Sequence, residues 1–135
     1  MKSLFTALLL LVLATACQQE NLSIEAPYRV KINAYTSNYV MQSRQAHRII
    51  LDLKTDSYYR QTGYQLVYYQ QAGLGRLYRD SVAILQRVPV ALPLGQSEWL
   101  FTPESTGVCQ VILIAQQERG YTRPDTVRLN FQIVP

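Results

Sequence analysis

The sequence predicts an all-β protein, an antiparallel β-sandwich of immunoglobulin-like or fibronectin-like type with about seven strands. Two observations support this class. β-Branched and aromatic residues are frequent after the N-terminal segment, where apolar and polar residues alternate over short stretches. Turn residues separate these stretches, and none of them shows the apolar period of about 3.6 residues that is typical of an amphipathic helix. We therefore expect two packed sheets and no helix in the body of the protein.

The N-terminal segment has the layout of a secretory signal peptide. Lys2 supplies a positive charge, an apolar run extends from Leu4 to Leu13, and small residues lead to Cys17. The run is too short to remain as a membrane span, which needs about 20 apolar residues. Small residues directly before a cysteine are typical of a bacterial lipobox, in which the thiol receives a diacylglyceryl group. We therefore expect residues 1–16 to be a lipoprotein signal peptide and Cys17 to become the lipidated first residue.

A lipid on Cys17 determines where the protein lies. Dual acylation anchors a protein stably, whereas a single chain gives only marginal binding. We expect residues 17–26 to form the lipidated cysteine and a polar tether, and residues 27–135 to form one β-sandwich domain. The predicted location is the cell envelope, with the outer membrane favoured. The alternative is an ordinary signal peptide that is cut near Cys17 and leaves a free thiol there.

The first two predicted strands follow the tether. Residues 28–34 carry apolar side chains at alternate positions, namely Tyr28, Val30, Ile32 and Ala34. Residues 48–54 place Ile49, Leu51 and Leu53 on one face and Arg48, Ile50, Asp52 and Lys54 on the other. Each segment therefore offers one apolar face to a core.

The later segments have the same character. They read YQLVYYQ, then QAGLGRLYR with its glycine turn, SEWLFTP, GVCQVILIAQ and TVRLNFQIV. The last is the clearest, because one face carries Val127, Leu129, Phe131 and Ile133. We expect Trp99 to lie in the core and not to form a platform for a ligand.

The segment from Asp80 to Gly95 departs from this pattern. It contains Pro89 and Pro93, which cannot donate hydrogen bonds to a neighbouring strand. We therefore expect it to form an edge strand or a long crossing connection.

Charge and cysteine content exclude several classes of function. The net charge of +4 is mild and dispersed along the chain, so no direct binding of nucleic acid is expected. The chain has 2 cysteines, and if Cys17 carries a lipid then Cys109 has no partner for a disulfide. Cys109 lies within VCQVILIA, so we expect a small buried side chain and not a reactive thiol.

The common catalytic and metal-binding motifs are absent from the sequence. His47 is the single histidine, and there is no C-x-x-C, H-E-x-x-H, P-loop or G-x-S-x-G pattern. We therefore expect no enzyme activity, no cofactor and no metal. The alternative is a hydrolase that combines His47 with Ser43 and a carboxylate. Without such a role, His47 is expected at the surface or half-buried at the start of a strand.

Two loops provide the candidate binding site. If the segments around Ile49, Tyr68, Ile112 and Leu129 are strands B, C, F and G of an immunoglobulin-like sandwich, the B–C and F–G loops share one end. These loops are TDSYYRQTG and QERGYTRPD. Tyrosine and arginine often carry the binding energy of interfaces, so the candidate partner-binding residues are Tyr58, Tyr59, Arg60, Arg119, Tyr121 and Arg123. The alternative is that the tyrosines cover the open end of the core and the arginines are solvated.

The stretch TGYQLVYYQQAGLGRLYRD, followed by SEWLFTPES and the closing RLNFQIV, resembles the TraQ conjugal transfer family of Bacteroidota conjugative transposons. Members of that family are small lipoproteins with a β-sandwich domain. The likeness extends from about Tyr28 to Val134 and includes the lipid signal. The sequence departs from the family in the unpaired Cys109 and the arginine-rich loop Arg119–Arg123. The resemblance implies a part in the envelope apparatus that transfers DNA between cells, and it brings no known active site.

These observations together predict a lipid-anchored structural or adaptor component of a conjugation apparatus. Its expected partners are the membrane, through the lipid on Cys17, and other proteins of the apparatus. The alternative is a surface lipoprotein that binds a ligand such as a glycan through Tyr58, Tyr59 and Tyr121.

Overall fold

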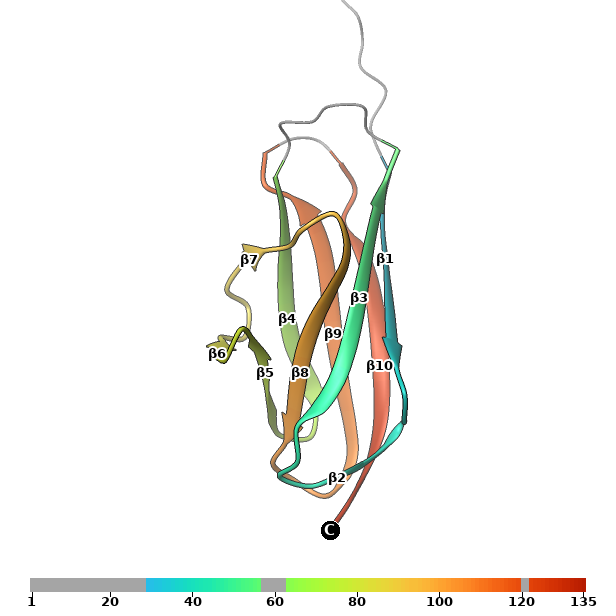
Figure 1. The fold of residues 1–135 in the computed structure, drawn as a ribbon, viewed down its shortest axis with the longest axis vertical. Coiled ribbons are helices and arrows are strands. Elements are labelled where there is room, and N and C mark those ends of the chain that lie inside the picture. The colour runs from blue at the N-terminus through green and yellow to red at the C-terminus, as the bar shows by residue number, and fades with distance from the viewer. Residues whose placement is uncertain (1–28, 57–62, 120–121) are drawn as a thin grey trace, which may run out of the picture.

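The structure is a computed structural model that describes residues 29–56, 63–119 and 122–135. These residues form two facing β-sheets of five strands each (Figure 1). The first sheet has the order β1-β3-β8-β5-β6, and the second has the order β2-β10-β9-β4-β7. The strands are β1 (Val30–Thr36), β2 (Val40–Gln42), β3 (His47–Thr55), β4 (Tyr64–Ala72), β5 (Gly75–Arg79), β6 (Val82–Ile84), β7 (Val90–Ala91), β8 (Gly95–Pro103), β9 (Gly107–Gln117) and β10 (Asp125–Val134).

The predicted all-β sandwich is confirmed. The three described ranges contain no helix, and so none that is long and apolar enough to cross a membrane. The predicted signal peptide, residues 1–16, and the predicted tether, residues 17–26, lie outside the described residues. Removal of the signal peptide and lipidation of Cys17 therefore stay predictions.

The strand count differs from the expectation of about seven. Seven strands of five or more residues match it, and β2, β6 and β7 add two or three residues each. Strands this short lie at sheet edges and span too few residues for an alternation of apolar side chains to be recognised.

Among the described residues, one strand pairing is parallel, in a sandwich whose other strand pairings are antiparallel. β2 runs parallel to β10, with Val40 opposite Gln132 and Gln42 opposite Val134. The cause is that β1 ends in the first sheet and the chain crosses to the edge of the second sheet before β2 begins. The backbone N–H of Gln132 donates to the carbonyl of Tyr39 at 2.9 Å, which holds this crossing in place.

The core lies between the two sheets, and the predicted faces are confirmed. Trp99 is 1% exposed, as expected of a core residue. The rings of Phe101 in β8 and Phe131 in β10 stack across the sandwich with their centroids 5.9 Å apart. The predicted apolar faces of β3 and β10 supply further buried residues, among them Ile49, Leu51, Leu53, Leu129 and Ile133. Each Å² of apolar surface that is removed from water stabilises the folded state by about 25 cal/mol, so this layer makes the main stabilising contribution.

The segment from Asp80 to Gly95 is both an edge and a crossing. It forms β6 at the edge of the first sheet and then β7 at the edge of the second. The backbone N–H of Arg87 donates to the carbonyl of Tyr68 at 2.8 Å, and that of Leu92 donates to the carbonyl of Tyr64 at 2.9 Å. These bonds fasten the segment along β4, so the free edge of that strand is covered.

Candidate functional site

Five strand ends meet at one end of the sandwich, at the top of Figure 1. β1 and β10 begin there, β3 and β9 end there, and β4 begins there. The register shows the meeting directly, because Tyr64 pairs with Gln117 and Val30 pairs with Thr55. We call this the loop end and define it by residues 29–31, 54–56, 63–64, 117–119 and 122–125. β3, β4, β9 and β10 occupy the positions assigned to strands B, C, F and G, so the segments that follow β3 and β9 leave the sandwich at this end.

The structure describes two of the predicted partner-binding residues. Arg119 and Arg123 are both exposed at the loop end. The other four, Tyr58, Tyr59, Arg60 and Tyr121, lie outside the described residues. Partner binding by this set therefore stays a prediction.

Three further cations lie at the loop end, and the analysis of the sequence did not single them out. Arg29 forms a parallel β-bridge with Arg123, which brings two distant parts of the chain together. Lys31 in β1 lies directly opposite Lys54 in β3. Like charges in directly opposite positions destabilise a pair of strands. The alternation placed Lys31 and Lys54 on solvent-facing sides, but only the register shows that they are neighbours.

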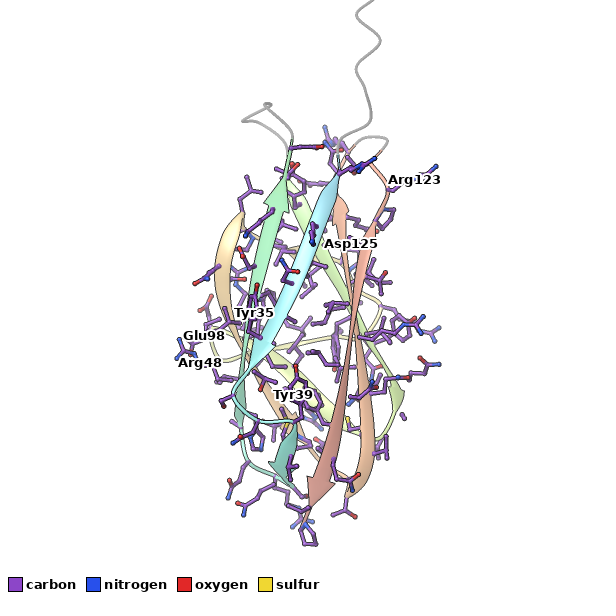
Figure 2. The ribbon with its side chains drawn as sticks, turned by 90° about the vertical axis from the view of Figure 1, so that its right-hand side faces the viewer. Tyr35, Tyr39, Arg48, Glu98, Arg123 and Asp125 are labelled. Atoms are coloured by element: carbon purple, nitrogen blue, oxygen red, sulfur yellow. The ribbon has the colours of Figure 1, made fainter. Side chains whose placement is uncertain are left out.

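The nearby carboxylates mostly bind the backbone. Asp56 Oδ1 accepts the N–H of Arg29 at 2.7 Å, and Asp125 Oδ2 accepts the N–H of Ile32 at 2.9 Å. Lys54 Nζ lies 3.4 Å from Asp52 Oδ2. Within the described ranges, no ion pair is formed by Arg29, Lys31, Arg119 or Arg123. Figure 2 shows Arg123 and Asp125 at the start of β10.

An apolar stripe crosses the solvent-facing side of the first sheet. Tyr35 pairs with Ile50, Tyr78 pairs with Leu100, and Ala83 pairs with Tyr78. Directly paired residues point to the same face of a sheet, and diagonal neighbours on adjacent strands are about 7–8 Å apart. Ile50 and Leu100 are such a diagonal pair. We call these five residues the outer stripe, and it touches every strand of the first sheet.

The outer stripe is open to solvent and contains an ion pair at its centre. Tyr35 is 50% exposed and Leu100 is 39% exposed. Arg48 pairs with Leu100 and Glu98 pairs with Ile50, so the ion pair between Arg48 Nη2 and Glu98 Oε2, at 2.7 Å, crosses the stripe between Ile50 and Leu100. Figure 2 shows Tyr35, Arg48 and Glu98 on the same side of the molecule. The sequence held one signal of the stripe, since Ile50 is apolar on the otherwise polar face of its strand.

A shallow hollow of about 350 Å³ lies between β4 and the segment around β7. Its lining includes Tyr64, Leu92 and Arg79. Arg79 Nη1 donates to the carbonyl of Ala91 at 2.7 Å, and its guanidinium lies 5.1 Å from the centroid of the Trp99 ring. Arg79 therefore fixes the crossing segment to the core, and these contacts explain its position without a ligand.

The groups that most often carry out chemistry are engaged in structural contacts. Cys109 is fully buried, burial raises the pKa of its thiol, and Gln70 Nε2 donates to its Sγ at 3.7 Å. His47 is half-buried at the start of β3, where its Nε2 donates to the carbonyl of Gln42 at 3.1 Å. Both positions agree with the expectations from the sequence. Over the described part of the chain, no group of three or more potential metal ligands gathers.

Comparison with known families identifies the chain's relatives. The family model of TraQ conjugal transfer proteins matches residues 1–131. The chain belongs to this family. The match confirms the resemblance inferred from the sequence. The protein is therefore a member of a family of conjugal transfer proteins.

Three solved structures from Bacteroides share the TraQ-type sandwich. A conjugative transposon lipoprotein from Bacteroides eggerthii is 20% identical with a TM-score of 0.63, and the match covers 78% of this chain and 96% of that chain. A lipoprotein from Bacteroides thetaiotaomicron is 20% identical with a TM-score of 0.67, covering 84% and 86%. A conjugate transposon protein from Bacteroides vulgatus is 18% identical with a TM-score of 0.65, covering 84% and 91%. At this level of identity the likeness establishes the fold. No curated protein matches the sequence.

Proposed function

We propose that this TraQ-family protein is a lipid-anchored structural component of a conjugative transfer apparatus. Cys17 holds it at a membrane of the cell envelope, and the outer stripe binds another protein of the apparatus. The family match over residues 1–131 carries the proposal, because it includes the segment around Cys17 as well as the sandwich. Two of the similar structures are lipoproteins by description, which supports the anchor.

A non-catalytic role is supported by the state of the polar groups. The thiol of Cys109 is enclosed in the core, and the His47 ring is hydrogen-bonded to the backbone. A general base must lie within hydrogen-bonding reach of a substrate proton, and a nucleophile must be accessible. The buried Cys109 thiol lacks the access that a nucleophile needs, and one ring nitrogen of His47 is occupied by a backbone carbonyl.

The outer stripe has the composition of a protein contact. It places two tyrosines and an exposed leucine on the rigid face of a five-stranded sheet, beside the Arg48–Glu98 ion pair. Interfaces concentrate their binding energy in aromatic and arginine side chains that a partner removes from water. The ion pair between Ile50 and Leu100 offers both signs of charge to complementary groups on the partner, which would contribute specificity to the contact.

Some backbone groups at the sheet edges are already bonded within the protein, which favours binding through side chains over addition of a strand. Asp125 occupies the N–H of Ile32 on the edge strand β1, and Arg79 occupies the carbonyl of Ala91 on the edge strand β7. β6, the other edge strand of the first sheet, has three residues. A peptide that adds to a sheet needs a row of free N–H and C=O groups.

The test is site-specific crosslinking in cells that carry out conjugation. A photoreactive amino acid replaces Leu100 in the outer stripe, and the matched control replaces Leu85, which is 68% exposed on the segment between β6 and β7. We expect a crosslink to a transfer-apparatus protein from position 100 and none from position 85. Cys17→Ala should abolish the crosslink, because the protein is then released from the membrane.

Two outcomes would contradict the proposal. Crosslinks from position 85 alone would place the contact elsewhere. Crosslinks to polysaccharide-uptake proteins, with bound glycan, would instead support the ligand-binding lipoprotein.

A further inference from the structure

We infer that the loop end docks on the membrane that holds the lipid anchor, by contact with anionic lipid headgroups. The inference rests on the proposed anchor at Cys17. Two features support this orientation, namely the place where the anchored chain enters the sandwich and the charges that surround that place.

The entry point lies at the loop end. Arg29 is the first described residue, and β1 begins beside it at Val30. Twelve residue steps separate Cys17 from Arg29, and an extended chain of that length reaches about 40 Å at most. β9 has 11 residues and spans about 35 Å, which approximates the length of the sandwich. The C-terminus lies at the opposite end (Figure 1). The anchor therefore confines the loop end to within about 40 Å of the headgroups, and the far end can lie up to one sandwich length further away.

The loop end carries an excess of exposed positive charge. Its exposed carboxylates are Asp56 and Glu118, and its exposed cations are Arg29, Lys31, Lys54, Arg119 and Arg123. Asp52 and Asp125 are not exposed. Asp52 pairs with Lys54, so among the described residues the exposed cations of the loop end without an ion pair are Arg29, Lys31, Arg119 and Arg123. Lysine and arginine near a membrane surface are attracted to anionic lipids, and this attraction increases with the number of cations.

The opposite end has a different electrostatic character. Arg76 Nε lies 2.9 Å from Glu104 Oε1, so that pair is neutral overall. Arg44 is the remaining exposed cation among the residues described there. Leu74 and Val108 are 63% and 64% exposed at that end. An anionic surface therefore distinguishes the two ends by charge.

The anchor and the charges act together. Electrostatic attraction is screened over about 8 Å at physiological ionic strength, so free protein would rarely experience it. A tether raises the effective concentration of the loop end at the surface and makes a few weak contacts sufficient. The outer stripe crosses the strands between the two ends, so this orientation leaves it accessible to a protein partner.

The test measures the depth of two positions in the lipidated, full-length protein. Single cysteines replace Thr126 near the loop end or Val108 at the far end, and each is labelled with a fluorophore; Cys109 is fully buried and Cys17 carries the lipid. The protein is reconstituted into vesicles of phosphatidylglycerol and phosphatidylethanolamine that contain a headgroup-attached quencher. We expect quenching at position 126 to exceed that at position 108 several-fold, and to decrease when salt is raised to about 1 M.

A charge-matched pair of variants isolates the electrostatic contribution. The loop-end triple variant Lys31→Glu, Arg119→Glu and Arg123→Glu should lose most of the difference between the two positions. The control triple variant Arg44→Glu, Arg87→Glu and Arg128→Glu changes the net charge equally and should retain the difference. All six residues are exposed, so both variants are expected to fold.

The outcomes separate this inference from the proposed function. Equal quenching at positions 126 and 108 overturns the docking inference. So does a difference between the two positions that is as large in vesicles of phosphatidylcholine alone as in the anionic vesicles. Either result leaves the anchor intact. Absence of lipid on Cys17 by mass spectrometry overturns the anchor itself, and with it both proposals.

Discussion

Asp125, the first residue of β10, accepts the backbone N–H of Ile32 in β1 at a distance of 2.9 Å between Oδ2 and N. The two residues belong to different sheets, so this hydrogen bond joins the sheets at the loop end. It also occupies a donor on the outer edge of β1, which would otherwise be open to another strand. Figure 2 shows Asp125 close to β1.

Removing this acceptor should destabilise the sandwich. Asp125→Ala leaves the half-buried N–H of Ile32 without its partner, and we expect the free energy of unfolding to fall by about 1–3 kcal/mol. Asp125→Asn retains an acceptor and should lose less. Urea unfolding followed by tryptophan fluorescence measures both, with Thr126→Ala as the neighbouring surface control. Equal losses of unfolding free energy for the Asn and Ala variants would show that the charge of Asp125, and not its hydrogen bond, stabilises the contact between β1 and β10.

Trp99 and Leu100 are adjacent in β8 and face opposite sides of the sheet. Trp99→Ala opens the core, so we expect a loss of about 3–5 kcal/mol in unfolding free energy. Leu100→Asp alters the exposed outer stripe and should change stability by about 0.5 kcal/mol or less. In return, Leu100→Asp should eliminate association with the transfer-apparatus partner. A stable Leu100→Asp protein that still associates would argue against the outer stripe as the contact.

Stability should decline in alkaline solution. Burial raises the pKa of both the Cys109 thiol and the Tyr68 hydroxyl. Below the ordinary thiol pKa, both the folded and the unfolded chain keep these protons, so the two groups do not make the free energy of unfolding depend on pH. Above it, the unfolded chain ionises first, and the free energy of unfolding falls as pH rises towards the folded-state pKa. The urea midpoint should therefore be lower at about pH 10 than at about pH 7.

Cys109→Ala separates the two groups in that experiment. The variant should lose stability at neutral pH, because it leaves a small cavity, but its decline should begin at a higher pH, where tyrosine ionises. In the unaltered protein, a thiol reagent should modify Cys109 only after the sandwich unfolds. Rapid modification under native conditions would show that the core opens far more readily than its packing implies.

The loop prediction has a test of its own. Replacing Tyr59 and Tyr121 together by alanine should abolish partner capture without lowering the thermal midpoint, if these residues bind a partner. A lower midpoint with capture intact would mean that the tyrosines cover the core. Comparison with Leu100→Asp then distinguishes the loop end from the outer stripe as the protein contact.

The sequence predicted features that depend on one strand at a time. The alternation in residues 127–133 correctly assigned the buried face of β10, and Trp99 was correctly placed in the core. The short strand β2 was missed, because three residues carry no measurable period, whereas β6 and β7 lie in the segment that was expected to form an edge strand or a crossing connection. The parallel pairing of β2 with β10 depends on where the chain changes sheets, which local composition does not record.

The candidate surfaces were less predictable for the same reason. The outer stripe joins Tyr35 to Ala83 through the register of five strands, and no single segment reveals it. The bridge between Arg29 and Arg123 likewise depends on long-range contact. The placement of the B–C and F–G segments at a common end was predictable, because it follows from the order of strands in this class of sandwich.

The complete pairing of β1 with β3 has a mechanical consequence. Seven residue pairs join the two strands, from Val30 opposite Thr55 to Thr36 opposite Ile49. A force that pulls on the chain at Arg29 away from the sandwich acts along β1, parallel to the strand axis. The hydrogen bonds between β1 and β3 are then loaded in shear. They share the force, so they break together and not one after another. A pull on the N-terminal end of β1 would therefore have to break the whole ladder together before the sandwich unravels.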